Sequence, residues 1–419
     1  MLIRFRVSNF RSLKDEQELS LVAALPDGRT DLVRMEGAGL NLLRVAGIYG
    51  ANAAGKSNVL EALEFMSQAV RGSHRQWGPE QPIPREPFLL DPKMREEPSL
   101  FEADFLIDGV RYQYGFRLDD ERVLEEWLHT YPKNRRQVWL SRNADALEPF
   151  AFGRELKGSN RTIEALTRKN SLFLSVAAEN NHQALLPVYS WFVKGINFSS
   201  ARNRADRIPL RALEQDEKGI LNFLKLADLG IVDFEIQSQI VPVARIKEGE
   251  VPLQPASVLR IDLYLKHQAK HGEISLPIER ESQGTRAWLS LLEPFLDTLS
   301  NRGVLCIDEL DASLHPHLAA EVIRIFQDPD RNPGGAQLIF NTHDTNLLGN
   351  LLSERPILHR DQVWFVEKDS EGASHLYPLT DFKPRKAENL ERGYLQGRYG
   401  AIPFISAQLQ LENAEESPE

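Results

Sequence analysis

Residues 50–57 have the sequence Gly-Ala-Asn-Ala-Ala-Gly-Lys-Ser, which satisfies the pattern G-x-x-x-x-G-K-[ST]. They follow the apolar run LLRVAGIY at 42–49, typical of a buried strand, and precede NVLEALEFMSQAV, whose apolar spacing favours a helix lying on a sheet. A glycine-rich turn in this place directs backbone N–H groups and the positive end of a helix dipole toward one point. The order strand, turn, helix therefore predicts an α/β core with a phosphate-binding loop, and disfavours a chance glycine-rich turn.

Such a loop predicts how a nucleotide triphosphate and its Mg²⁺ ion are held. We expect the Lys56 ammonium to reach the β- and γ-phosphates and the Ser57 hydroxyl to ligate Mg²⁺. The preference between purines stays open, because the loop contacts phosphates and not bases. The residues expected to bind the nucleotide in this loop are Gly50, Asn52, Ala53, Ala54, Gly55, Lys56 and Ser57.

A second segment, GVLCIDELD at 303–311, is an apolar strand that ends abruptly in carboxylates. Asp308 is suited to hold Mg²⁺, usually through water, and Glu309 to position or deprotonate an attacking water. Solvated acids at an ordinary strand end are the alternative when the segment is taken alone. The presence of the phosphate-binding loop favours the catalytic interpretation.

Two further segments carry candidate ligand groups. The apolar QLIF at 337–340 is followed by Asn-Thr-His, which places His343 at the carboxyl edge of a parallel sheet, where ligands bind in α/β folds. A lone histidine is more often structural, so His343 depends on the other motifs. The segment ESQGTR precedes a helical pattern, so Ser282 and Gly284 lie at a helix start that can receive an anion, although a plain helix cap explains Ser282 equally well.

The rest of the chain alternates between β and helical patterns. Ile3, Phe5 and Val7 alternate with polar residues and predict a half-buried first strand, and Asp108-Gly109 between FEADFLI and VRYQYGF predicts a hairpin in an antiparallel β section. Residues 160–230 are compatible with helices.

Composition excludes some classes of protein. The net charge of −10 argues against a sequence-independent DNA coat, which needs phosphate neutralisation. Cys306, the one cysteine, excludes an intramolecular disulfide and is expected in the core. The chain lacks a signal-like apolar segment, so we expect a cytoplasmic protein without membrane contact. Basic residues concentrate in the middle third, where they form either a solvated surface or a local nucleic-acid track: Arg135, Arg136, Arg154, Lys157, Arg161, Arg168, Lys169, Arg202, Arg204 and Arg207.

Taken in order, GANAAGKS, ESQGTR, VLCIDELDASLHP and FNTHD resemble the Walker A, signature, Walker B with D-loop, and switch histidine of an ABC-type ATPase. The opening FRVSNFRSL and the segment DELDASLHP are similar to the branch with SMC, Rad50 and OLD-type (AAA15-type) ATPases. The resemblance implies an α/β ABC-type P-loop ATPase head, with a mixed sheet flanked by helices, an antiparallel β subdomain and a helical insertion.

The expected division of the chain follows from these motifs. Residues 1–155 are expected to form the N-terminal part of the ATPase head, with the P-loop and the antiparallel β section, and residues 156–255 a mainly helical insertion. Residues 256–385 are expected to form the C-terminal part of the head, with the signature, Walker B and switch histidine. Residues 386–419 are expected to be a C-terminal segment with an acidic tail.

The resemblance also implies a homodimer or higher homo-oligomer in which two heads enclose two nucleotides. Ser282 and Gly284 then act in trans, Glu309 and His343 serve the hydrolysis of ATP, and Arg11 approaches the nucleotide. The D-loop match, Asp311 to Leu314 with Ser313 in it, is expected to cross the dimer interface. A Q-loop glutamine cannot be placed, and Gln113 is a weak candidate for it.

The ending ERGYLQGRYGAIP at 391–403 resembles that of stand-alone bacterial ATPases from two-component anti-phage systems. This implies a sensor or regulatory subunit that controls a separate nuclease of the TOPRIM or RloB kind and responds to DNA or a phage-derived trigger. A packing segment without a partner explains the ending equally well. The rival functions are a Rad50-like ATPase in DNA repair or DNA-end binding, and a scaffold that binds nucleotide without useful turnover.

Overall fold

The computed structural model describes residues 1–25, 28–35, 39–200, 217–226, 230–243, 256–312, 314–384 and 388–403. Several sequence-derived candidates lie outside the described residues, namely Ser313, Arg202, Arg204, Arg207 and the acidic tail at 412–419.

A six-stranded sheet forms the centre of the molecule, with the strand order β11-β15-β16-β5-β17-β18. Neighbouring strands are parallel except for β18, which pairs antiparallel with β17. Helices cover both faces of such a sheet, so its four inner strands are mostly buried, whereas the edge strands β11 and β18 are half-buried. The strands are β5 (Val45–Gly50), β11 (Ile196–Ser200), β15 (Val304–Asp308), β16 (Gln337–Asn341), β17 (Val363–Lys368) and β18 (Ser374–Pro378).

The two faces of the central sheet belong to two separate cores. In β15, Val304 and Cys306 pack in the core that contains α1 (Lys56–Gly72), which confirms the buried position expected for Cys306. Leu305 and Ile307 pack in the core that contains α9 (Gln283–Asn301) and α10 (Pro316–Gln327). The alternation of side chains along a strand therefore places α1 on one face of the sheet and α9 on the other.

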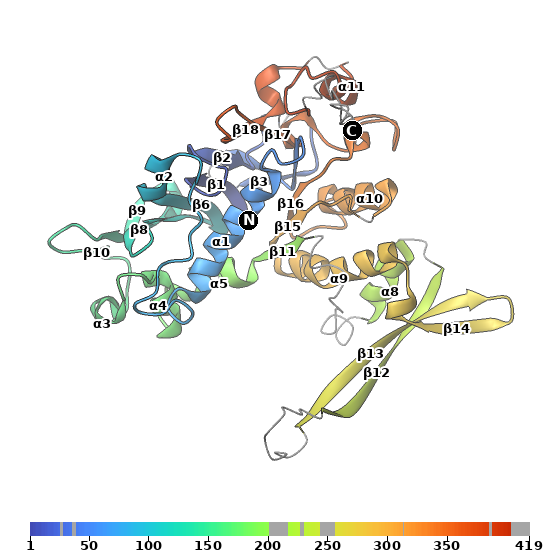
Figure 1. Cartoon of the computed structure of the whole chain (residues 1–419), viewed down its shortest axis with the longest axis horizontal. Helices are drawn as coiled ribbons and strands as arrows, with labels where there is room; N and C mark the ends of the chain where they lie inside the picture. The colour runs from blue at the N-terminus through green and yellow to red at the C-terminus, as the bar shows by residue number, and fades with distance from the viewer. Residues whose placement is uncertain are drawn as a thin grey trace, which may run out of the picture.

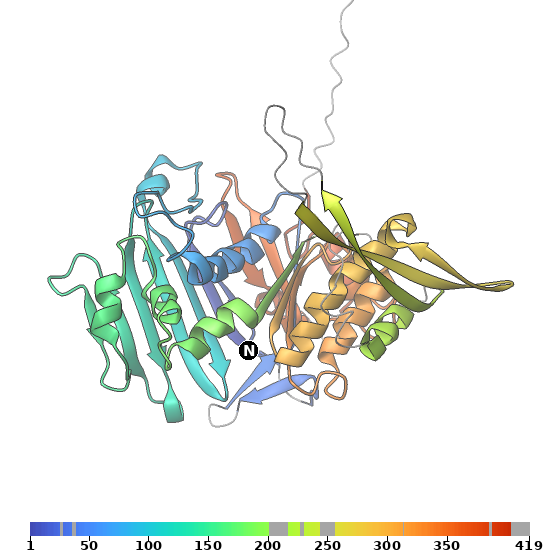
Figure 2. The same ribbon diagram turned by 90° about the horizontal axis from the view of Figure 1, so that it is seen from below.

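A seven-stranded antiparallel sheet packs over α1, in the order β10-β9-β8-β7-β6-β1-β2, and Figure 2 shows α1 between the two sheets. In β1, Ile3, Phe5 and Val7 are buried as predicted. Asp108 and Gly109 both have positive φ at the β6–β7 turn, which confirms the predicted hairpin. The strands are β1 (Leu2–Ser8), β2 (Gln17–Ser20), β6 (Ser99–Ile107), β7 (Val110–Leu118), β8 (Val123–Thr130), β9 (Gln137–Asn143) and β10 (Phe150–Phe152).

The insertion predicted at 156–255 combines helices and strands. The helices are α3 (Asn160–Leu166), α4 (Phe173–Glu179), α5 (Leu186–Lys194) and α8 (Glu217–Leu226). The helical pattern did not predict two strands that also lie in this range. The strand β11 at 196–200 joins the central sheet beside β15, and β12 (Ile231–Val243) follows the alternation of Phe234 and Ile236 with polar residues, which is a strand period. The domain boundaries themselves remain a prediction.

A three-stranded antiparallel sheet, β12-β13-β14, extends away from the body of the molecule (Figure 1). It contains β13 (Ala256–Ala269) and β14 (Gly272–Pro277), and leads through η2 (Ile278–Arg280) into α9. The remaining elements are β3 (Leu32–Met35), β4 (Leu40–Leu43), α2 (Pro92–Glu96), α11 (Leu390–Leu395), and the 3-10 turns η1 (Pro132–Asn134), η3 (Thr345–Leu348), η4 (Arg360–Gln362) and η5 (Leu379–Phe382). Among the described residues, no helix has the length and apolarity needed to span a bilayer.

The fold thus has the predicted class: a mixed central sheet flanked by helices, joined to an antiparallel β subdomain.

Candidate nucleotide-binding site

Three predicted motifs meet at one edge of the central sheet. The strands β5, β16 and β15 are parallel neighbours, with β16 in the middle, so their carboxyl ends lie side by side. Gly50 ends β5, Asp308 ends β15 and Asn341 ends β16. The P-loop, the carboxylates after β15 and the segment with His343 therefore share the edge where ligands bind in parallel α/β sheets.

The loop between β5 and α1 requires its glycines. Gly55 is the residue before α1, with φ of 108°, and a Cβ there would lie 2.2 Å from Ser374 Oγ. A Cβ at Gly50 would lie 2.4 Å from the carbonyl oxygen of Val366. No side chain caps the first turn of α1. The N–H groups of this turn are consequently not used by a cap and can face an anion.

Lys56 is buried at the base of the loop, with 6% of its surface exposed. Its ammonium donates hydrogen bonds to the carbonyl oxygens of Gly50 and Ala51, each at 3.0 Å. Burial lowers the pKa of Lys56 to about 8, against the opposing influence of Asp311, Glu309 and Asp308. Within the described part of the chain, no carboxylate forms an ion pair with Lys56. An anionic ligand would stabilise a buried ammonium that has no ion-pair partner.

Two serines that the motifs did not indicate brace the loop. Ser374 Oγ donates its proton to the carbonyl oxygen of Ala54 at 2.5 Å and shares a hydrogen bond of 2.7 Å with Ser12 Oγ. Ser12 Oγ also accepts a hydrogen bond of 2.6 Å from the Asn58 side chain in α1. The three contacts tie the loop to the first hairpin and to β18. No local pattern predicts them, because Ser12 and Ser374 are far apart in the sequence.

Asn341 organises the carboxylates at the end of β15. Its buried side chain donates to Asp308 Oδ1 and accepts a hydrogen bond of 2.6 Å from the backbone N–H of Glu309. Glu309 has φ of 55° and an exposed side chain, whereas Asp308 is half-buried. This turn separates the two acids. Asp308 is held against β16 by Asn341, whereas the side chain of Glu309 is exposed to solvent. The sequence predicted both acids and missed the asparagine between them.

His343 lies beside the D-loop match of the same chain. Thr342 Oγ1 donates to Asp311 Oδ1 at 2.6 Å, and the backbone N–H of His343 donates to the same oxygen at 3.3 Å. Burial lowers the pKa of His343, and the charge of Lys56 lowers it further. The imidazole is therefore neutral at pH 7 and can donate one hydrogen bond and accept another.

Arg11 is close to the helix of the P-loop and is already paired. Its guanidinium contacts Glu61 of α1 and makes a two-bond ion pair with Glu86, at 2.9 and 3.0 Å. These carboxylates raise the pKa of Arg11 against the cost of burial. The Q-loop candidate Gln113 lies in β7, where its side-chain oxygen accepts a hydrogen bond of 2.8 Å from Tyr131. The amide of Gln113 thus forms its hydrogen bond beside the antiparallel sheet.

Ser282 and Gly284 are at the start of α9, on the opposite face of the central sheet from α1. Ser282 Oγ accepts a hydrogen bond of 3.1 Å from the backbone N–H of Thr285, so the helix-cap interpretation is correct for the single chain. The described contacts of Ser282 all lie within α9. A role for these residues at a second subunit's nucleotide remains a prediction.

The sequence matches the profile of the AAA_21 family, described as "AAA domain, putative AbiEii toxin, Type IV TA system", over residues 45–349. Among solved structures, the chain is similar to the SMC head domain from Thermotoga maritima, with 14% identity over 90% of this chain and 98% of that chain and a TM-score of 0.41. It is also similar to the Smc head domain with an extended coiled coil from Pyrococcus furiosus, with 12% identity over 95% and 98% and a TM-score of 0.41. It is also similar to cbiO1 from Clostridium perfringens, part of an ABC transporter complex, with 12% identity over 95% of this chain and 97% of that chain and a TM-score of 0.32.

No curated protein matches the chain. The profile match covers more than half of the sequence and includes the P-loop, the carboxylates after β15 and His343. The chain therefore belongs to the AAA_21 family of P-loop ATPase domains.

Proposed function

We propose that this chain binds ATP with Mg²⁺ at the carboxyl edge of the central sheet and hydrolyses it. The observation that carries the proposal is the buried ammonium of Lys56, which lies in a loop with an uncapped helix start and is influenced by the carboxylates after β15. A cradle of glycines and N–H groups fits the phosphates, and the acids at 308 and 309 fit a cation and a water molecule.

Each residue then has a distinct task. The loop amides and Lys56 hold the β- and γ-phosphates, and Ser57 with Asp308 would hold the metal. Mg²⁺, when bound, neutralises charge on the transferred phosphoryl group. Glu309 orients and deprotonates the attacking water, while neutral His343 contacts the γ-phosphate. Asn341 fixes the spacing of the two acids through its bonds to Asp308 and to the Glu309 backbone.

We further propose that the active form is a homodimer in which Ser282 and Gly284 of one subunit contact the nucleotide of the other. Both residues are at a helix start, which favours anions, and α9 packs away from the P-loop of its own subunit. A second copy supplies the signature segment that the single chain places on the other face of its sheet.

The test is the variant Glu309→Gln. It should bind ATP as the parent does, hydrolyse it at least about 100-fold more slowly through loss of the general base, and accumulate as an ATP-dependent dimer. Phosphate release and size-exclusion chromatography with light scattering measure these effects. Glu125→Gln, on the exposed side of β8, is the matched control and should behave as the parent. Turnover of Glu309→Gln at the parent rate would exclude this carboxylate as the base.

We propose a regulatory role in bacterial defence, in which the ATPase controls a separately encoded nuclease. The support is the family description, which names a toxin and a toxin–antitoxin system, and the resemblance of residues 391–403 to ATPases of two-component anti-phage systems. A nuclease gene adjacent to this one, whose product changes activity with the ATP state of the dimer, is the expected finding. An isolated gene without such a neighbour would count against the role.

A Rad50-like DNA-binding ATPase is the second candidate, and one observation favours it. Lys133, Arg135 and Arg136 are exposed around the β8–β9 turn, and no described carboxylate pairs with them. Other basic residues are engaged within the fold: Arg168 donates to three backbone carbonyls and Arg161 pairs with Glu164. DNA binding that weakens steeply with salt would support this candidate, and its absence would exclude it.

A further inference from the structure

The three-stranded sheet β12-β13-β14, here called the arm, is continuous with the start of α9. Strand β14 ends at Pro277, the 3-10 turn η2 follows at once, and Glu281 then precedes the Ser282 cap. Figure 1 shows the arm leaving the body of the molecule beside α9. The base of the arm therefore leads directly into residues 281–284, here called the signature turn.

One ion pair holds the signature turn against the arm. The His267 imidazole in β13 donates from Nε2 to Glu281 Oε1 at 2.7 Å, because an ionised carboxylate can only accept. The two side chains are 23% and 7% exposed. Ile278, which lies just before the signature turn, is buried in the same core as Leu263 of β13. The residue before the Ser282 cap is thus held by a strand of the arm and not by its own helix.

The burial of Glu281 depends on His267. A carboxylate taken out of water is costly unless it is paired. Within the described part of the chain, the only side chain that bonds to Glu281 is that of His267. Without the imidazole, Glu281 would move into water, while the bond from Thr285 N–H to Ser282 would still cap α9. Loss of the pair should therefore displace the signature turn without unfolding the helix.

We infer that His267 and Glu281 are positioning residues, which fix the signature turn for its contact with the nucleotide of a second subunit. The inference rests on the proposed dimeric ATPase and adds the contact that sets the position of Ser282. Ser282 and Gln283 are exposed, whereas the Glu281 side chain before them is buried against β13. The signature turn is thus presented outward from a fixed base. Contacts in a transition state tolerate little displacement, since a shift of about 1 Å can cost on the order of a hundredfold in rate.

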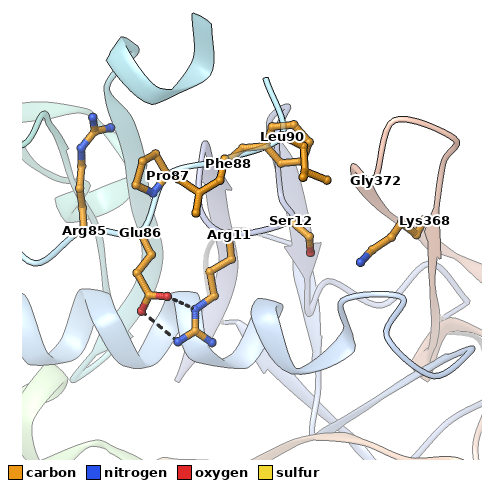
Figure 3. Close-up of a pocket in the computed structure, with 10 residues that line it drawn as sticks. Arg11, Ser12, Arg85, Glu86, Pro87, Phe88, Leu90, Lys368 and Gly372 are labelled. Carbon is orange, nitrogen blue, oxygen red and sulfur yellow. Dashed lines mark hydrogen bonds and ion pairs between the residues drawn. The ribbon is translucent and has the colours of Figure 1, made fainter. Parts of the chain in front are cut away.

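The P-loop is braced by a separate set of contacts. Arg11 pairs with Glu86 beside α1, at one wall of a cavity of about 410 Å³ that also has Phe88 and Leu90 in its lining (Figure 3). The walls of this cavity come from the first hairpin, the loop before α2 and the β17–β18 turn, and not from the arm. The helices α1 and α9 also lie on opposite faces of the central sheet. A change in the His267–Glu281 pair should therefore leave the P-loop of the same chain undisturbed.

The experiment compares three variants of the whole chain by phosphate release and by isothermal titration calorimetry with Mg²⁺-ADP. His267→Ala should lower kcat for ATP hydrolysis by about tenfold and leave the affinity for Mg²⁺-ADP unchanged. His267→Gln should recover most of the rate, since its side-chain amide can still donate to Glu281. Lys266→Ala is the matched control. It removes an ion pair of the same length, 2.7 Å to Asp233, from the next residue of β13, and should behave as the parent.

A double-mutant cycle tests whether the two residues act as one pair. Glu281→Ala should lose about as much activity as His267→Ala, and the double variant should lose no more than either, because each single change already removes the bond. Losses that multiply in the double variant would show that the two side chains act separately, and would overturn the inference.

The other contrary results are distinct. A parent-like kcat in His267→Ala, no recovery in His267→Gln, or an equal loss in Lys266→Ala would overturn the positioning role and leave the proposed ATPase intact. Weaker binding of Mg²⁺-ADP by His267→Ala would also overturn it, because the change would then act through the structure as a whole. A parent protein that binds Mg²⁺-ADP but does not hydrolyse ATP would overturn the proposed function, and this inference with it.

Discussion

The N-termini of the helices α1 and α9 can both bind an anion, yet their capping differs. Gly55 precedes α1 in a left-handed conformation and offers no side-chain cap, whereas Ser282 precedes α9 and binds the Thr285 N–H. The start of α9 is thus satisfied within one chain, with a cap worth about 1 kcal/mol, and the start of α1 is not. We infer that the uncapped start of α1 can bind a ligand within a single chain, while an anion at α9 must compete with the Ser282 cap.

The largest expected effect is at α1. Lys56→Ala should weaken binding of Mg²⁺-ATP by about a hundredfold, because charged hydrogen bonds to the phosphates are lost. Thermal stability at pH 7 should not fall, since the change removes a buried charge whose pKa burial has lowered to about 8. Titration calorimetry and thermal melts measure the two effects. Lys169→Ala, which changes an exposed lysine, is the control. If Lys56→Ala bound nucleotide as the parent does, the start of α1 would not be the ligand site that distinguishes it from the start of α9.

A smaller effect is expected at α9, where two substitutions separate capping from action in trans. Ser282→Ala should lower the free energy of unfolding by about 1 kcal/mol through loss of the cap. Ser282→Asp retains a good cap and adds a negative charge, so stability should stay near the parent while turnover falls by about tenfold. Chemical denaturation and steady-state ATP hydrolysis are the measurements. Ser159→Asp, before α3, controls for the added charge. Parent-like turnover in Ser282→Asp would mean that Ser282 only caps its helix.

The last expected effect concerns pH and the buried ammonium at α1. Lys56 stays protonated in the unfolded chain up to its ordinary pKa and loses its proton in the fold at about pH 8. Above pH 8 the unfolded state binds more protons, so the stability of the parent should rise relative to Lys56→Met by about 1 kcal/mol per pH unit. Urea denaturation of both proteins at pH 7, 8, 9 and 9.5 tests this. A difference that does not change with pH would show that Lys56 is not strained by burial in the absence of nucleotide.

Much of the fold and the site could be predicted from local patterns. The P-loop at 50–57, the strand ending at Asp308 and the strand before His343 are each contiguous, and their order along the chain predicts that parallel strands bring them to one edge. The hairpin at Asp108–Gly109 follows from two residues that tolerate positive φ. Such features depend on residues that are neighbours in the sequence, so the sequence alone suffices to predict them.

Other features could not be predicted because they depend on residues distant in sequence. Asn341 has the pattern of a strand end, and only the pairing of β15 with β16 places it between Asp308 and Glu309. Ser12 and Ser374 brace the P-loop only because β18 returns beside the first hairpin. The strand β11, inside the range predicted to be mainly helical, was missed for a related reason, since a five-residue strand is recognisable only by its partner β15.

The sequence by itself determined the chemistry available at this edge: a phosphate loop, its lysine and two adjacent acids, all encoded in short motifs with strict spacing. Tertiary structure alone decided how Arg11 is paired, which asparagine separates the acids and where an apolar cavity opens beside the loop. The physical reason is that motif spacing specifies local backbone geometry, whereas ion pairs, buried hydrogen bonds and cavities arise from strands and loops that meet only when the chain has folded.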